Sequence, residues 1–145
     1  MEVRIYETIS DDSRLSYEFF SEGQNGRIRK IVQYQKMMDN IYNLTFGDWN
    51  VYHQKIDDKT ISNNNDREKV LFTVASTVII FLTYYPGTAV YFEGSTPSRT
   101  RLYQMGINAN LHIISPRFNI LGISNNISEP FKAGKNYEAF LIFYL

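Results

Sequence analysis

Residues 90–104 read VYFEGSTPSRTRLYQ, and this stretch decides how the second half of the chain folds. An apolar run ends at Gly94, and hydroxyl residues and a proline follow. Thr96 suits the N-cap of a helix, and Pro97 suits its first position, where a missing N–H has no cost. The stretch therefore predicts a strand over residues 88–93 and a helix over residues 97–114, which Ser115-Pro116 ends.

The residues after this helix complete the predicted sheet. Residues 118–123 are expected to form a strand, and residues 124–136 a loop rich in Asn, Ser, Pro and Gly. Residues 137–145 are apolar nearly throughout, which indicates a last strand at a central position of the sheet. Because strand–helix–strand connections are right-handed, we expect the strands at 88–93 and 118–123 to be parallel in an otherwise antiparallel sheet.

The first half of the chain shows strand patterns separated by turns. Val3 and Ile5 alternate with polar residues and predict a short strand. Residues 17–20 and a segment around residues 28–34 predict two strands joined at Gly23-Gln24-Asn25-Gly26, which is a hairpin signal. Residues 41–46 alternate again, Gly47-Asp48 supplies a turn, and residues 51–54 are expected to return as a strand.

A polar loop over residues 57–66 leads into the first predicted helix. This helix is expected to begin near Asp66, to carry an apolar stripe and to end at Pro86-Gly87. The stripe contains Val70, Leu71, Val74, Val78, Phe81 and Leu82, which indicates the central buried helix. Val, Ile and Thr are frequent in the same segment, so a pair of strands is the alternative.

Together these elements predict one α+β domain over residues 1–145, in the order β-hairpin–β(β)–α–β–α–β–β. The sheet is expected to be mixed but mostly antiparallel, with both helices on one face. A chain of 145 residues that is 43% hydrophobic can bury one core without covalent staples. The absence of cysteine excludes disulfides, thiol nucleophiles and zinc-thiolate sites.

The charge distribution limits the classes of partner. Residues 1–93 carry 10 basic and 13 acidic side chains, whereas residues 94–145 carry 5 basic and 2 acidic. A wholly basic nucleic-acid binder is therefore excluded, whereas a local basic face in the second half stays open. The acidic start lacks the pattern of a signal peptide, and the apolar stretch at 70–82 is shorter than a membrane span of ~20 residues. We expect a cytoplasmic protein without a membrane partner.

The start of the second helix is the candidate binding site. The N–H groups of Ser98 and Arg99 are expected to be free there, with the hydroxyls of Ser95, Thr96 and Ser98 nearby, and Gly94 would let a ligand approach the backbone. Arginines beside free amides indicate a phosphate or carboxylate site. The expected ligand-binding residues are Gly94, Ser95, Thr96, Ser98, Arg99, Arg101 and Tyr103, joined by Asn64 and Asp66 if both helices start on the same side of the sheet.

Helical spacing separates the two arginines. At ~100° per residue, the second helix is expected to bury Leu102, Met105, Ala109 and Ile113, and to place Arg101 on the solvated side with Gln104 and Asn108. Arg99 lies at the border of the buried face, near Tyr103 and Gly106. A half-buried guanidinium needs a partner. That partner is a ligand, Glu93, Asp66 or a backbone carbonyl.

No catalytic or metal-ligating pattern emerges, so the sequence favours a binding protein over an enzyme and predicts no metal or cofactor. The acidic residues lack the spacing of a calcium loop, and His53 and His112 lie outside any ligand-spaced cluster. The best hypothesis is a domain that binds a phosphate-bearing ligand or nucleic acid. One alternative is a protein–protein interaction module or homodimer, which the many aromatic residues favour. A second is a metal-independent ribonuclease of the toxin type that uses His53, Arg99 and Tyr103.

Three segments also resemble a known family. They are GSTPSRTRLY at 94–103, YNLTFGD at 42–48 and NNNDREKVLFTVASTVIIF at 63–81, and the match spans essentially the whole chain. The chain resembles a family of small single-domain bacterial proteins of unknown function. The resemblance implies a stand-alone bacterial domain with Asn64, Asp66, Arg99 and Arg101 in its most characteristic segments, and it leaves the function open.

Overall fold

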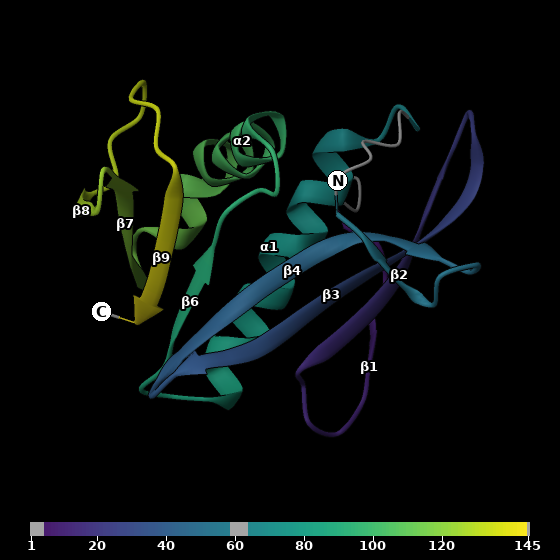
Figure 1. Cartoon of the computed structure of the whole chain (residues 1–145), viewed down its shortest axis with the longest axis horizontal. Coiled ribbons are helices and arrows are strands. Elements are labelled where there is room, and N and C mark those ends of the chain that lie inside the picture. Colours follow the sequence, from purple (N-terminus) through teal and green to yellow (C-terminus); the bar gives the residue numbers. More distant parts are fainter. Residues whose placement is uncertain (1–4, 59–63, 145) are drawn as a thin grey trace.

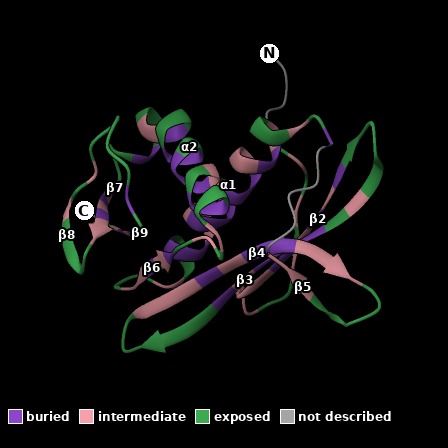
Figure 2. Ribbon diagram, turned by 45° about the horizontal axis from the view of Figure 1, so that its top comes forward, coloured by how far each residue is buried: buried purple, intermediate pink, exposed green. Residues whose placement is uncertain are grey.

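A computed structural model describes residues 5–58 and 64–144, which fold into a mixed sheet and two helices (Figure 1). The predicted α+β class and the mostly antiparallel sheet are confirmed. Figure 2 shows both helices side by side on the same face of the sheet. The helices are α1 (Arg67–Tyr84) and α2 (Pro97–Ile114). The strands are β1 (Ile9–Ser10), β2 (Ser16–Gly23), β3 (Gly26–Met38), β4 (Ile41–Asn50), β5 (Lys55–Asp57), β6 (Ala89–Phe92), β7 (Phe118–Ser124), β8 (Ile127–Pro130) and β9 (Ala139–Tyr144).

The strand order is β1-β2-β3-β4-β6-β9-β7-β8, with β5 paired to β4. The predicted central position of the last strand is confirmed, because β9 lies between β6 and β7 and pairs antiparallel with both. The strands β6 and β7 consequently run in the same direction without being neighbours. The parallel pair in the described part of the chain is instead β4 with β6, so α1 is the crossover helix between adjacent parallel strands.

Several predicted strand boundaries in the first half are wrong. Val3 lies outside the described residues, Ile5 and Tyr6 are not in a strand, and β1 is the first strand among the residues that the structure describes. Gly47-Asp48 is no turn, because β4 runs on to Asn50 and residues 51–54 form the turn into β5. A Cβ on Gly47 would lie 2.1 Å from the carbonyl oxygen of Asp57, so this glycine permits close approach of β5 rather than a reversal of the chain.

The loop predicted at residues 124–136 contains one short strand. Residues 127–130 pair with β7 and form β8, at the end of the sheet. Strand propensity is low in this Asn-, Ser- and Pro-containing segment, so pairing with β7 decided its conformation.

Packing of α1 on the sheet forms the first part of the core. Its buried side chains are Val70, Thr73, Val74, Thr77, Val78, Phe81 and Leu82, so the helix prediction is confirmed and the strand-pair alternative is wrong. The rings of Tyr34 and Phe81 stack with centroids 4.3 Å apart. The hydroxyls of Tyr34 and Thr77 share a hydrogen bond of 2.8 Å, which satisfies two polar groups inside the core.

Helix α2 has the predicted bounds but not the predicted buried face. Its exposed side includes Ala109, with Met105 and Ile113 exposed by 46% and 49%. Its buried side chains are Arg99, Thr100, Tyr103, Gln104, Gly106, Ile107, Asn110 and Ile114. Gln104, expected in solvent, donates to the carbonyl of Lys135 (2.6 Å) and accepts from the N–H of Tyr137 (3.2 Å). Internal backbone groups therefore hold polar side chains that hydropathy alone assigns to the surface.

Candidate functional site

The start of α2 satisfies much of its own hydrogen bonding. The side chain of Thr96 is the N-cap, as predicted, and its hydroxyl oxygen accepts from the N–H of Arg99 at 3.2 Å. The N–H of Thr100 donates to the Thr96 carbonyl at 3.0 Å. The Arg99 amide, expected to be free, is thus taken by the cap.

Residues Gly94 and Ser95 make contacts within the protein. A Cβ on Gly94 would lie 2.2 Å from the nitrogen of Thr100, so the first turn of α2, and not a ligand, occupies the space beside this glycine. The N–H of Gly94 donates to the hydroxyl of Thr100 at 3.0 Å, and the hydroxyl of Ser95 donates to the carbonyl of Asp58 at 2.7 Å. The junction between β6 and α2 is therefore closely packed and internally hydrogen-bonded, and we call it the packed joint.

Arg99 is buried, with 4% of its surface exposed, and connects α2 to the sheet. Its Nη2 donates to the carbonyl of Phe46 in β4 at 2.6 Å, so a backbone carbonyl is one of the partners considered from the sequence. The guanidinium carbon lies 5.2 Å from the centre of the Phe46 ring and 5.9 Å from that of Tyr103. Burial raises the pKa of Tyr103, while the charge of Arg99 and a hydrogen bond from it act in the opposite direction.

A pocket of about 800 Å³ lies between the first turns of the two helices. Asn64 and Asp66 line it together with Arg99 and Tyr103, so the structure brings the two predicted segments together. The described residues around it are Lys30, Phe46, Asn64, Asn65, Asp66, Arg67, Glu68, Val70, Leu71, Arg99, Leu102, Tyr103, Met105 and Ala109. We call this space the interhelix pocket.

Lys30 is a buried, charged pocket residue that the sequence did not lead us to predict. It lies in β3 with 5% of its surface exposed, and its Nζ is 2.5 Å from a carboxylate oxygen of Asp48. The signal was present, because strand alternation places position 30 on the same face as Ile28, Val32 and Tyr34. A lysine at a core-facing position is expected to pair with an acidic side chain or to contact a bound anion.

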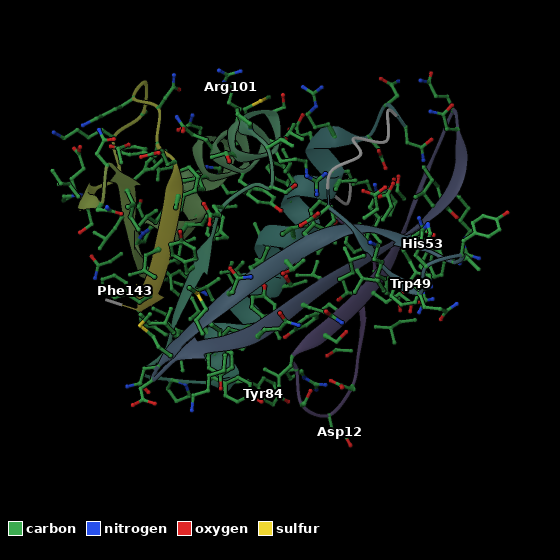
Figure 3. The ribbon with its side chains drawn as sticks, in the orientation of Figure 1. Asp12, Trp49, His53, Tyr84, Arg101 and Phe143 are labelled. Atoms are coloured by element: carbon green, nitrogen blue, oxygen red, sulfur yellow. The ribbon has the colours of Figure 1, made fainter. Side chains whose placement is uncertain are left out.

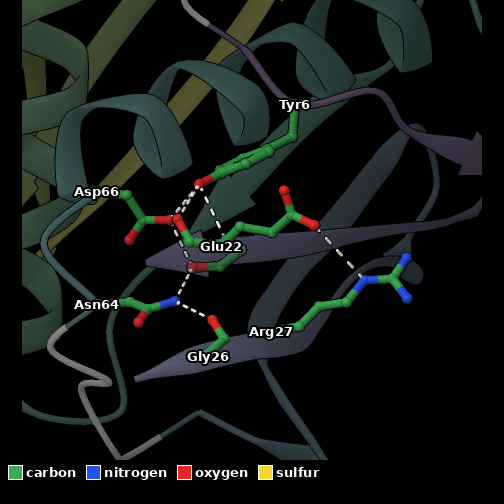
Figure 4. Close-up of polar contacts among 7 residues, drawn as sticks. Tyr6, Glu22, Gly26, Arg27, Asn64 and Asp66 are labelled. Carbon is green, nitrogen blue, oxygen red and sulfur yellow. Dashed lines mark hydrogen bonds and ion pairs between the residues drawn. The ribbon is translucent and has the colours of Figure 1, made fainter. Parts of the chain in front are cut away.

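Asn64 and Asp66 hydrogen-bond residues of the N-terminal segment and of the β2–β3 hairpin at the start of α1 (Figure 4). The carboxylate of Asp66 accepts from the hydroxyls of Tyr6, at 2.6 Å, and Ser21. The amide nitrogen of Asn64 donates to the Ser21 hydroxyl and to the Gly26 carbonyl, both at 2.9 Å. Burial, and then the hydrogen bond to Asp66, raise the pKa of Tyr6. We call these four side chains, Tyr6, Ser21, Asn64 and Asp66, the latch.

The remaining predicted residues lie away from the interhelix pocket. Gly94 and Ser95 line an adjoining pocket of about 400 Å³ together with Tyr103, Asp58 and Glu93. Thr96 serves as the cap, and Ser98 and Arg101 are exposed on the first turns of α2. The exposure predicted for Arg101 is confirmed.

The three residues of the ribonuclease hypothesis are not brought together. Arg99 and Tyr103 are neighbours, but His53 lies in the turn between β4 and β5, where its N–H donates to the side chain of Asn50. Figure 3 shows His53 in the region of β4 and β5, far from Arg101 of α2. Across residues 5–58 and 64–144, no group of three or more acidic, His or Cys side chains is placed to hold a metal ion.

Fold and site define a class: a small α+β domain with two helices on one face and a pocket with buried cations between their starts. The chain belongs to DUF6934, a family of unknown function, whose model matches residues 2–144. The resemblance to a family without known function is thereby confirmed, and bacterial origin stays a prediction. Comparisons with curated proteins and with solved structures give no significant match. In the described part of the chain, no helix has both the length and the hydropathy that crossing a membrane requires.

Proposed function

We propose that the protein is a binding domain for a phosphate-bearing anion, which it holds in the interhelix pocket. The observation that carries this proposal is that Lys30 and Arg99, each at most 5% exposed, line the same pocket of about 800 Å³. That volume lies within the range of small-molecule sites. Cations in a wall with little water attract an anion more strongly than cations on an open surface do.

The charges around the pocket indicate where the anion would lie. Lys30 and Arg99 lie at the sheet side, where Asp48 already pairs with Lys30 at 2.5 Å, and Arg67 adds a positive charge in the first turn of α1. Asp66 and Glu68 also line the pocket, and Asp66 is engaged by the hydroxyls of the latch. A phosphate is therefore expected near Arg99, with Asp66 and Glu68 at the side of α1 and Asp48 paired with Lys30.

Two exposed arginines provide a matched test. Arg67 and Arg101 are the first and fifth residues of their helices and both are exposed, but only Arg67 lines the pocket. Melting temperature and calorimetric affinity are measured with inorganic phosphate, a mononucleotide and a short single-stranded oligonucleotide. Binding raises the melting temperature with ligand concentration. We expect Arg67→Ala to weaken binding about fivefold, as for the loss of a rim charge of about 1 kcal/mol, and Arg101→Ala to leave it unchanged.

Comparing the affinities for the oligonucleotide and the mononucleotide shows whether the ligand is a nucleic acid or a small phosphate compound. An Arg99→Gln variant that retains its helical circular dichroism is expected to lose binding altogether, because it removes the buried charge. If none of the three ligands raises the melting temperature, or if Arg67→Ala and Arg101→Ala weaken binding equally, the proposal is wrong.

A protein–protein module or homodimer is the second candidate, favoured by apolar side chains on the surface. Val51 and Tyr52 in the β4–β5 turn are 66% and 94% exposed, and Ile113 of α2 is 49% exposed. Light scattering over a range of concentrations tests the homodimer. A mass that rises with concentration and is restored to the monomer by Tyr52→Ser supports it, and a monomer throughout contradicts it.

A further inference from the structure

Apolar side chains also line the interhelix pocket and form its apolar wall. Leu102, Met105 and Ala109 line it from α2, and Val70 and Leu71 line it from α1. Leu102, Met105 and Ala109 belong to the apolar stripe of α2 that hydropathy assigns to the core. The pocket accounts for their position, since three of the four residues of that stripe face it and only Ile113 does not.

An apolar cavity lies next to this wall. It measures about 50 Å³, and Leu71 and Tyr103 line both the cavity and the interhelix pocket. Its other described lining residues are Leu44, Val74, Ala75, Val78, Ile79, Phe92, Gly106, Ile107, Ile114, Phe118 and Ile142, all of them apolar or glycine. A cavity with such a lining holds hydrocarbon more readily than water.

We propose that the ligand is an amphipathic anion: a phosphate or similar head near Lys30 and Arg99, and an apolar chain of several carbons along Leu71, Leu102 and Met105. The end of the chain points toward the small cavity beyond Leu71 and Tyr103. This inference rests on the proposed function and narrows it to ligands that carry both a charge and a hydrocarbon tail. Met105 suits this role, because its unbranched thioether adapts to a chain.

The test is a calorimetric titration of the full chain with inorganic phosphate and with butyl, hexyl and octyl phosphate, all below micelle-forming concentrations. Octanol is the control ligand, because it has the same hydrocarbon chain as octyl phosphate but no charge. Burying a methylene strengthens binding about threefold to fourfold at ~0.8 kcal/mol each, so affinity should rise steeply along the series. Octanol should bind far more weakly than octyl phosphate, because it lacks the charge that Lys30 and Arg99 attract.

Met105 and Ile113 supply a matched pair of variants, since both lie on α2 and are 46% and 49% exposed, but only Met105 lines the pocket. Met105→Gln should weaken octyl phosphate about tenfold and leave inorganic phosphate unchanged. Ile113→Gln should change neither. Both substitutions are on the surface, so folding is expected to be preserved.

The outcomes separate this inference from the function on which it rests. If phosphate compounds bind but affinity does not rise with chain length, the inference of an amphipathic ligand is wrong and the proposal of an anion-binding domain is unaffected. If no phosphate compound binds, both are overturned. If octanol binds as well as octyl phosphate, the anion site is wrong. If Met105→Gln has no effect on octyl phosphate, or Ile113→Gln has the same effect, the apolar wall is not where the chain lies.

Discussion

The two helices start beside the same pocket, but α1 buries an apolar face and α2 buries a polar one. α1 turns an apolar stripe inward, with Thr73 and Thr77 as its polar members. α2 turns Arg99, Gln104 and Asn110 inward, and leaves Met105 and Ile113 about half exposed. An apolar stripe predicts the buried face of a helix only where the surface opposite is apolar as well. Where that surface offers backbone carbonyls and amides, as for Gln104 and Arg99, polar side chains are buried instead.

The two helix starts differ in the same way. Thr96 uses its side chain locally, to cap α2. Asp66 occupies the N-cap position of α1 but makes no capping bond, and its carboxylate joins the latch. One residue therefore stabilises its own helix, and the other holds distant segments together. Substitutions at matched positions can separate these roles.

The largest effect is expected at Gly94, which precedes α2, and Gly106 inside α2 is the matched comparison. A Cβ on Gly94 would lie 2.2 Å from the Thr100 nitrogen, whereas a Cβ on Gly106 would lie 3.4 Å from the Cβ of Leu71. Gly94→Ala should lower the free energy of unfolding by about 3 kcal/mol, because backbone has to move. Gly106→Ala should stay within about 1 kcal/mol of the original, because the contact is ordinary and alanine favours helix. Urea denaturation measures both, and equal losses would contradict the packed joint at Gly94.

The next largest effect concerns the latch and the cap. Asp66→Ala should cost about 2 kcal/mol, because two hydroxyls lose a charged acceptor, while Thr96→Ala should cost about 1 kcal/mol as an ordinary cap. Hydrogen exchange distinguishes them further. The N–H of Tyr6 donates to the hydroxyl of Thr73 at 2.8 Å, so it should exchange faster in Asp66→Ala only. Faster exchange in Thr96→Ala as well would mean that the latch and the cap unfold together.

The smallest effect is a dependence of stability on alkaline pH. Burial raises the pKa of Tyr17 to about 12, and burial also raises that of Tyr34, which stacks on Phe81 of α1, and of Tyr103 in α2. Tyrosines of the unfolded chain ionise near 10, so the stability from the buried hydroxyls is present below pH 10 and is lost as pH rises toward 12.

Urea denaturation at pH 9 and pH 11 should show Tyr17 contributing about 1 kcal/mol to this loss. In Tyr17→Phe that part of the loss should vanish. The variant should not be destabilised at neutral pH, because the Tyr17 hydroxyl is buried without a hydrogen-bond partner among the described residues. An identical decline in both proteins would show that other groups, such as lysines, dominate.

The sequence by itself determined the elements whose signals are local. Thr96, Pro97 and Ser115-Pro116 fix the bounds of α2, because capping and the missing proline N–H act within one turn. The hairpin of β2 and β3 follows in the same way from Gly23 and Gly26. For α2, helical spacing placed Arg101 correctly in solvent and Arg99 at the edge of the buried face, but it assigned Gln104 and Met105 to the wrong sides.

Only the tertiary structure decided how these elements meet. Three features join residues that are far apart in the chain. β4 pairs in parallel with β6, β9 lies between β6 and β7, and α2 buries its polar face. The bond from Arg99 to the Phe46 carbonyl spans 53 positions, and Lys30 reaches the same pocket from a third segment. Such contacts depend on which backbone groups and charges face each other after folding, and no local pattern encodes that.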